Sequence, residues 1–372
     1  MDGITREFVS LTSPTAGRNG AGFLPCQGLY YAPTGHAPRT AFIATHYNVD
    51  FSEHYLAEYL ARRGHGFLGW NTRYRGNETY FLLEHALIDI GVGVGWLRQR
   101  TGVEQVVLLG NSGGGSLMAA YQSQAVTPSL EPRAGGGLPE AVECLLPADL
   151  YISLNAHPGR PEVLTAWMDP SVVDENDPTS LDPALDMYDE ANGPPYAPDF
   201  VTRYRSAQEA RNHRITAWVR AELARLQENG MFDRVFTMAR TWADLRLLDA
   251  SLDPSDRPIG LCYAGNPRWA NYSPFGIGHA NSLRTWLSMW SLESSPCRGA
   301  AHLRRIEVPS LVLQSTADTG VFPSDARKIH ELLASADKRL EFLPGDHYLL
   351  DPEEARDDVA DRVAGWLEEH PG

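Results

Sequence analysis

Short apolar runs alternate with longer amphipathic segments over most of this chain. Runs rich in branched side chains predict buried strands, and apolar residues three or four apart predict helices that cover them. Strands are expected near 7–11, 28–31, 41–44, 66–70, 106–109, 149–154, 310–314 and 339–343. Helices are expected near 51–63, 80–100, 117–121, 201–228, 281–292 and 323–336, with a last helix from Asp351. This alternation predicts an α/β fold with a mostly parallel central sheet flanked by helices.

The alternation stops after the sixth expected strand and resumes at Pro309. The segment between, residues 158–304, contains several Asp-Pro steps and then helical patterns; we call it the insert. We expect one core, residues 1–157 and 305–372, interrupted by an insert that is mainly helical. The clearest helix of the insert, 201–228, has an apolar face made by Ile215, Trp218, Val219, Leu223 and Leu226.

A candidate nucleophile lies where the fifth expected strand meets the next helix. The residues Gly110–Gly114 read Gly-Asn-Ser-Gly-Gly, a G-x-S-x-G pattern between a strand and a helix. A sharp turn of this kind strains the backbone of the serine, and its neighbours two residues away must be nearly free of side chain. The start of the helix also directs backbone N–H groups to the place where negative charge would develop. Ser112 is therefore the expected nucleophile.

A nucleophilic serine needs a base, and the base needs a carboxylate that orients it. Asp318 follows the seventh expected strand and His347 follows the eighth, so the chain order is Ser, Asp, His. We expect His347 to take the proton of Ser112 and to deliver it to the leaving group. Asp318 would hold the imidazole in the productive tautomer.

Other carboxylates fit the orienting role less well. Asp346 adjoins His347, and neighbouring residues seldom direct their side chains at each other. Asp325 falls in the first turn of an expected helix, where it favours the helix dipole. The loop after the sixth strand contains no carboxylate before Glu162. Asp318 is the preferred residue.

Two N–H groups are needed to bind an oxyanion. One is expected from Gly113, directly after the nucleophile, and the other from the loop after the third strand. That loop reads His46-Tyr47-Asn48, and either Tyr47 or Asn48 could be the second donor.

These residues resemble the α/β-hydrolase fold superfamily over about residues 25–155 and 305–370. The resemblance rests on the following positions: Gly110–Gly114, Asp318, His347, the Thr45–Asn48 loop and Arg75-Gly76. Family members usually carry His-Gly-x in the third-strand loop, which makes His46 the matching histidine and Asn48 the donor by position. Tyr47 stands where glycine is usual. The resemblance also implies that the insert is a cap domain over the active site.

Composition excludes several classes of partner. The formal net charge of the 372 residues is −15, which disfavours nucleic acid and anionic membrane surfaces. No apolar run approaches a membrane span, and Met1–Ser10 lacks the apolar stretch of a signal peptide. Four cysteines lie far apart without a C-x-x-C pair, so we expect free thiols and a cytoplasmic protein.

The leading hypothesis is a serine hydrolase that cleaves an ester of a small or medium-sized carboxylic acid. The aromatic residues of the insert suggest an apolar pocket beneath it. Hydrolysis of a carbon–carbon bond in a diketone-like substrate is an alternative, because Asn111 resembles the Gly-Asn-Ser elbow of ring-cleavage-product hydrolases. Amidase or lactonase activity would use the same residues. A non-catalytic ligand-binding module is a further alternative, although such proteins usually lack one of the three residues.

No cofactor and no metal are expected. The twelve histidines show no H-E-x-x-H spacing, and no G-x-x-x-x-G-K-[ST] phosphate loop is present. The expected partner is a small-molecule ester or related carbonyl compound. The sequence leaves a homo-oligomer open.

Overall fold

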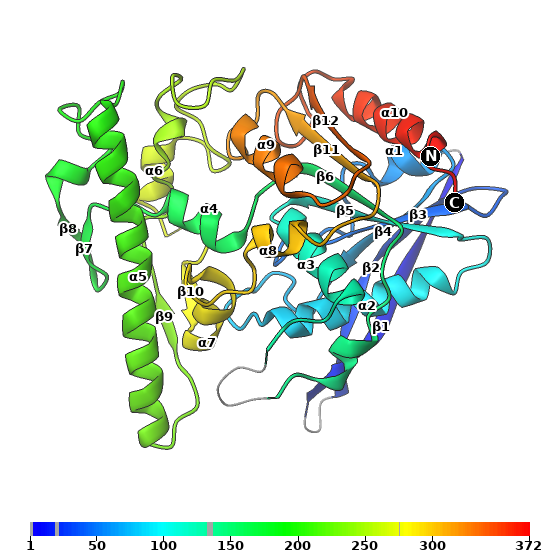
Figure 1. The fold of residues 1–372 in the computed structure, drawn as a ribbon, viewed down its shortest axis with the longest axis horizontal. Helices are drawn as coiled ribbons and strands as arrows, with labels where there is room; N and C mark the ends of the chain where they lie inside the picture. The colour runs from blue at the N-terminus through cyan, green and yellow to red at the C-terminus, as the bar shows by residue number, and fades with distance from the viewer. Residues whose placement is uncertain (1–2, 19–21, 132–136, 275) are drawn as a thin grey trace.

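A computed structural model describes residues 3–18, 22–131, 137–274 and 276–372 of the chain. In these residues eight strands form one sheet in the order β1-β2-β4-β3-β5-β6-β11-β12 (Figure 1). β2 is antiparallel to β1 and β4, and the other neighbouring strands are parallel. The strands are β1 (Ile4–Arg18), β2 (Gly22–Pro33), β3 (Thr40–Ala44), β4 (Gly66–Asn71), β5 (Gln105–Ser112), β6 (Leu150–Ala156), β11 (Ser310–Ser315) and β12 (Lys338–Leu343). The predicted mostly parallel sheet is confirmed.

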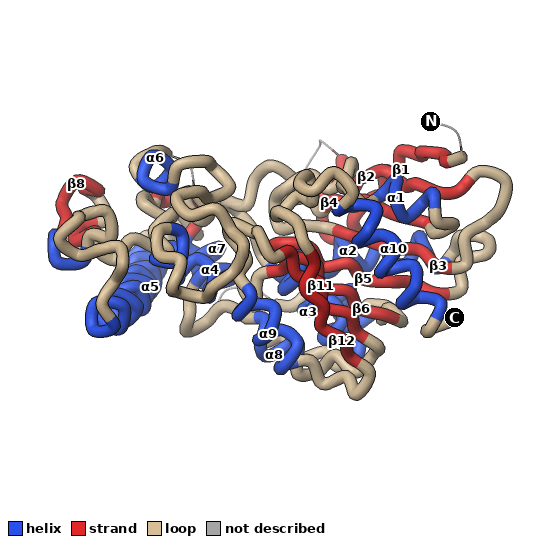
Figure 2. Tube along the Cα trace, turned by 90° about the horizontal axis from the view of Figure 1, so that it is seen from above, coloured by secondary structure: helices blue, strands red, loops and turns tan. Residues whose placement is uncertain are grey.

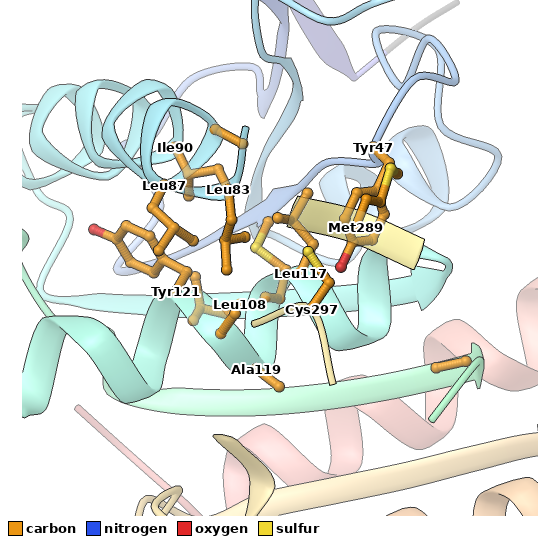
Figure 3. Packing of buried hydrophobic residues seen from close by; sticks show 14 of the residues in the cluster. Tyr47, Leu83, Leu87, Ile90, Leu108, Leu117, Ala119, Tyr121, Met289 and Cys297 are labelled. Carbon is orange, nitrogen blue, oxygen red and sulfur yellow. The ribbon is translucent and has the colours of Figure 1, made fainter. Parts of the chain in front are cut away.

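Helices cover both faces of the sheet. Alternate residues of β5 divide between the faces: Val106 and Leu108 pack with one set of helices, and Val107 and Leu109 pack with the other. The first set is α2 (Leu83–Arg98), α3 (Gly114–Val126) and α9 (Pro323–Leu332), and the second is α1 (Ala57–Arg62) and α10 (Ala355–Glu368). Figure 3 shows the packing between α2 and α3. Apolar side chains on both faces explain why the strands read as continuous hydrophobic runs.

The insert lies beside the sheet, with the long helix α5 on the far side (Figures 1 and 2). Its helices are α4 (Arg160–Trp167), α5 (Pro198–Glu228), α6 (Pro267–Asn271), α7 (Leu283–Thr285) and α8 (Gly299–Leu303). Short strands β7 (Val172–Asp174) and β8 (Asp177–Leu181) pair with each other, as do β9 (Val235–Thr237) and β10 (Ala280–Ser282). Single helical turns lie at Glu140–Cys144 in the core and at Pro183–Leu185, Leu245–Leu247 and Trp286–Trp290 in the insert. The proposed domain boundaries stay a prediction.

Buried ion pairs hold much of the insert together. Asp169 is fully buried and accepts from Arg240 Nε at 2.9 Å and from Asn271 Nδ2 at 2.7 Å. Asp244, also fully buried, accepts from Arg205 Nη2 and Arg246 Nη2, each at 2.7 Å. Burial opposes ionisation of Asp244, but the two guanidinium groups outweigh it and hold the pKa of this carboxyl well below its usual range. The contacts of Asp169 with Arg240 and Asn271, and of Asp244 with Arg205, join segments that lie far apart in the sequence.

Several expected helices differ from the structure, and α9 ends at Leu332 rather than at 336. The helix expected at 51–63 is limited to Ala57–Arg62, because Ser52 N–H donates to Asp50 Oδ1 at 2.8 Å and holds the preceding residues in turns. The last helix begins at Ala355 rather than Asp351. Asp346 accepts backbone N–H groups of the segment before it and so prevents an earlier start.

The helix expected at 281–292 is divided into β10, α7 and a wider turn at Trp286–Trp290. In that turn Ser291 N–H donates to the carbonyl of Trp286, five residues earlier. The helix expected at 201–228 agrees more closely with the structure, since α5 covers the whole of that range. Trp218, expected on its buried face, is 40% exposed, because the apolar face of α5 is only partly covered.

Candidate active site

Ser112 is the last residue of β5, and Gly113 caps the start of α3. The serine has a φ of 54°, the left-handed conformation that the G-x-S-x-G pattern predicts. A Cβ on Gly114 would lie 2.2 Å from the carbonyl oxygen of Thr45, so only glycine allows the helix to approach the β3 loop this closely. The left-handed backbone of Ser112 and the close approach of Gly114 to Thr45 are the two features expected of a nucleophile elbow.

Asp318 and His347 come together at the ends of β11 and β12. His347 Nδ1 lies 2.6 Å from Asp318 Oδ2, and both side chains are almost fully buried. The other oxygen of the carboxylate accepts the backbone N–H groups of Gly320 and Val321, each at 2.9 Å. Asn155 Nδ2 donates to the carbonyl of His347 at 3.3 Å. The carboxylate and the imidazole are therefore fixed from several sides.

The rival carboxylates are engaged elsewhere. Asp346 Oδ1 accepts the N–H groups of Tyr348 and Leu350 at 2.9 Å. Asp325 Oδ2 accepts the N–H of Phe322 at 2.9 Å at the start of α9, as its expected place in the first turn suggested. Neither carboxylate contacts the imidazole through a hydrogen bond in the described part of the chain.

Ser112 and His347 line one cavity of about 400 Å³. The core contributes His46, Asn48 and Tyr55 to its wall, among others. The insert contributes Arg160, Trp167, Trp242, Tyr263 and Ile277. A larger cavity of about 780 Å³ lies within the insert, and its lining contains none of the expected site residues.

The loop after β3 holds the expected oxyanion donors. Asn48 N–H points at His46 Nδ1 at 3.3 Å, and Val49 N–H points at the same atom at 3.2 Å. The backbone N–H of Asn48 is therefore engaged within the loop, which favours the N–H of Tyr47 between the two expected donors. The Tyr47 side chain is fully buried, and its hydroxyl lies 3.1 Å from Ser116 Oγ.

Solved structures resemble this arrangement over nearly the whole chain. The crystal structure of the α/β hydrolase GrgF from Penicillium sp. sh18 aligns with a TM-score of 0.53 and 12% identity, covering 98% of this chain and 97% of that one. The structure of DcsB in complex with its substrate analogue aligns with a TM-score of 0.54 and 12% identity, covering 98% and 99%. This chain has the α/β-hydrolase fold. No protein-family model and no curated protein matches the sequence.

Within this α/β-hydrolase fold, sequence reasoning missed a tyrosine of the insert. Tyr263 Oη lies 3.0 Å from Asp318 Oδ1 and 2.9 Å from His347 Nδ1. Its ring packs on the imidazole with a centroid distance of 4.2 Å. Burial raises the pKa of Tyr263 well above its usual value, with the Asp318 charge acting in the same direction, so the phenol stays protonated and can donate. No local motif marks this residue, because its partners lie 55 and 84 positions away.

Two histidines of the cavity are held neutral. Burial lowers the pKa of His46 well below its usual value, and the Arg160 charge adds to this. Burial also lowers the pKa of His157, with His347 and Arg160 contributing. Because Nδ1 of His46 faces two N–H donors, its proton is assigned to Nε2. His46 thus presents an N–H to the cavity.

The described residues contain no group of three or more histidine, cysteine, aspartate or glutamate side chains that could hold a metal ion. None of the described helices is both long and apolar enough to cross a membrane. None of the four cysteines, all within the described residues, forms a disulfide, and Cys144 is exposed.

Proposed function

We propose that the protein is a serine hydrolase that cleaves a carboxylic ester through an acyl-enzyme. One observation carries this proposal: Ser112, in its strained turn, and His347 line the same cavity, and His347 Nδ1 lies 2.6 Å from a buried carboxylate of Asp318. The likeness to GrgF and DcsB supports the fold that presents these residues.

The proposed chemistry follows from the hydrogen bonds of the imidazole. Because Asp318 binds Nδ1–H of His347, Nε2 is left to accept the proton of Ser112 Oγ. The serine oxygen attacks the ester carbonyl, and His347 returns the proton to the departing alcohol. A water molecule then repeats the sequence on the acyl-enzyme. The carboxylate stabilises the imidazolium that forms in each half-reaction.

The insert would act as a cap that selects the substrate. Trp167 and Trp242 stack at a centroid distance of 4.7 Å, and Tyr263 lies against both. These rings give the cavity an apolar wall beside the nucleophile, and its volume of about 400 Å³ suits a small or medium-sized acyl group. A small-molecule ester is therefore the proposed partner.

Asn111 does not favour the carbon–carbon hydrolase alternative. Its Nδ2 donates to the carbonyl of Leu154 at 2.9 Å, and its Oδ1 lies 3.2 Å from His54 Nε2. Both ends of the amide are engaged in packing the turn, so a structural role accounts for this residue. Ester cleavage stays the single proposed activity.

The proposal is tested with p-nitrophenyl esters of increasing chain length, together with a fluorophosphonate that labels active serines. We expect turnover to disappear in step with labelling of Ser112, and the optimum chain length to measure the pocket. Ser112→Ala should lower kcat by about 10⁶-fold without changing the far-ultraviolet circular dichroism. Labelling without ester turnover would direct the search to diketones and lactones. An unlabelled Ser112 would favour a ligand-binding module instead.

A further inference from the structure

The catalytic cavity contains a buried cation that comes from the insert. Arg160 is the first residue of α4, and only 3% of its surface is exposed. Its Nη2 donates to Glu78 Oε2 at 3.0 Å, and within the described part of the chain this is the only hydrogen bond that its guanidinium makes. Arg160 lines the same cavity as Ser112. A desolvated charge with unused donors beside a nucleophile calls for a chemical role.

The guanidinium is held in place before any substrate arrives. Its carbon lies 4.7 Å from the centre of the Tyr47 ring and 4.5 Å from the centre of the Trp290 ring. The partner carboxylate, Glu78, is itself fixed by the N–H of Gly278, which donates to Oε1 at 3.2 Å. A charge fixed in this way needs no reorganisation during a reaction, which is the condition for strong electrostatic catalysis.

Nη1 of the Arg160 guanidinium lies next to Gly113, the residue that follows the nucleophile. A Cβ on Gly113 would lie 3.0 Å from Arg160 Nη1 and 2.6 Å from His46 Nε2. Since Gly113 has no Cβ, both nitrogens lie close to the Cα of Gly113, the residue whose amide the fold assigns to the oxyanion. The amide of Asn48, an expected second donor, is directed at His46 Nδ1 instead. The side-chain nitrogens of Arg160 and His46 therefore offer further donors near Gly113, in addition to the Tyr47 amide favoured above.

We propose that Arg160 is a catalytic residue that binds the oxyanion formed when Ser112 attacks the substrate carbonyl. This inference rests on the proposed function. The Oγ–carbon bond forms as the carbonyl π bond breaks, and its electron pair moves to the oxygen. The Oγ proton passes to His347, while Arg160 keeps its own protons and pairs with the new negative charge beside the Gly113 N–H. The insert thus supplies part of the catalytic machinery.

The competing role for Arg160 is to bind an anionic group of the substrate. Such a group is charged both before and during the reaction. If Arg160 bound it, substitution of Arg160 would therefore raise KM and leave kcat unchanged. Asp50 and Glu53 also line the cavity, and their charges oppose an anionic substrate. The oxyanion gains its charge only during the reaction, so loss of its donor lowers kcat. The two roles are separated by steady-state kinetics.

The test uses Arg160→Met in the full-length protein with the preferred p-nitrophenyl ester. We expect kcat to fall by about 10²–10³-fold while KM changes little. The inhibition constant of a boronic acid, which forms a tetrahedral anion on the serine, should rise by a similar factor. Binding of an uncharged, non-hydrolysable ether analogue should not change. Arg160→Lys, which keeps the charge but loses the planar fork, should lie between wild type and Arg160→Met.

Arg160→Met leaves Glu78 buried without its partner and could unfold the protein. The double variant Glu78→Gln/Arg160→Met removes both charges together and provides a folded comparison. Complete end-point labelling of Ser112 by the fluorophosphonate verifies that the nucleophile and its base survive in each variant. An unchanged kcat, a rise in KM alone or an unchanged boronic acid constant would overturn the inference. Absence of labelling and turnover in the wild type would instead reject the proposed function, and the inference with it.

Discussion

The core and the insert differ in how much charge they bury. In β5 and β6 the buried side chains are mainly aliphatic, and they pack on both faces of the sheet. In the insert, carboxylates such as Asp169 and Asp244 are fully buried and neutralised by arginines. Aliphatic packing needs only an apolar pattern within each strand, whereas each ion pair needs a particular partner. The strands of the core are therefore encoded locally, whereas the insert depends in addition on matched pairs of charged residues.

The candidate site is divided along the same boundary. Ser112, Asp318 and His347 follow core strands, while Arg160 and Tyr263 reach the site from the insert. The core would supply the covalent and proton-transfer chemistry, and the insert would supply charge and positioning. Substitutions in each region should therefore differ in kind as well as in size.

Among the substitutions that compare the two regions, the largest effect is expected from the core carboxylate. Asp318→Asn should lower kcat by about 10⁴-fold, because an amide favours the wrong imidazole tautomer, and ester kinetics would measure it. Asp346→Asn is the matched control, since this neighbouring carboxylate accepts only backbone N–H groups in the described structure. A greater loss of kcat from Asp346→Asn than from Asp318→Asn would reverse the assignment.

The next two substitutions, one in the insert and one in the core, compare the stability of the two regions. Asp244→Ala should lower the stability of the insert by about 3 kcal/mol, because it takes this carboxylate from the partly buried guanidinium groups of Arg205 and Arg246. Ile152→Ala removes a fully buried side chain of the core and should cost about 2–5 kcal/mol, spread over the whole sheet. Hydrogen exchange measured by mass spectrometry separates the two results: faster exchange is expected mainly at 158–304 for Asp244→Ala.

Glu209→Ala provides the control for the insert, because this carboxylate is exposed on α5. It should change stability by less than about 0.5 kcal/mol. Equal acceleration of exchange in the core and the insert after Asp244→Ala would show that the two regions unfold as one unit.

A smaller effect concerns acid stability of the core. Burial lowers the pKa of His54 from 6.5 to about 3. The unfolded chain therefore binds a proton that the folded chain excludes, so His54 makes stability fall as pH drops below 6.5 and stop falling near 3. The slope for one such histidine approaches about 1.4 kcal/mol per pH unit. Urea unfolding between pH 7 and 5 should show a shallower slope for His54→Gln, and no such change for the exposed control His36→Gln.

The smallest effect is expected from the tyrosine that joins the insert to the core carboxylate. Tyr263→Phe removes one hydrogen bond to Asp318 but leaves the two backbone donors in place. We expect kcat to fall by about 3–10-fold with little change in KM, equivalent to roughly 1 kcal/mol. Tyr188→Phe removes a hydroxyl of the insert that donates to the Trp242 carbonyl, and its kcat should stay near the wild-type value. Similar losses from both variants would assign Tyr263 to packing.

The sequence predicts those parts of the fold that are determined by residues close together in the chain. The apolar run before Ser112, the glycines around it and the order of Asp318 and His347 follow from short stretches at strand ends. The structure brings Asp318 and His347 together, as that order predicts. The β1–β2 pair extends beyond its expected ranges, because exposed edge residues carry no continuous apolar signal.

The residues that sequence reasoning missed depend on long-range contacts. Arg160 reaches Glu78 across 82 positions, and Arg240 reaches Asp169 across 71. No spacing rule links such pairs, and an arginine or tyrosine alone is common on protein surfaces. The prediction of a helix at 51–56 failed for a related reason. The side chains of Asp50 and Asn71 accept backbone N–H groups of this segment and hold it in turns, despite its helical pattern. Side-chain contacts decided each of these positions.

The stacked indoles of Trp167 and Trp242 have an optical consequence. Their ring centroids are 4.7 Å apart with an interplanar angle of 29°, and both line the candidate cavity. Indoles this close share their near-ultraviolet excitations, so the pair forms a coupled chromophore within the wall. A ligand that enters would change the polarity around it and alter both ellipticity and fluorescence. The protein thus contains an intrinsic spectroscopic probe of occupancy that needs no added dye.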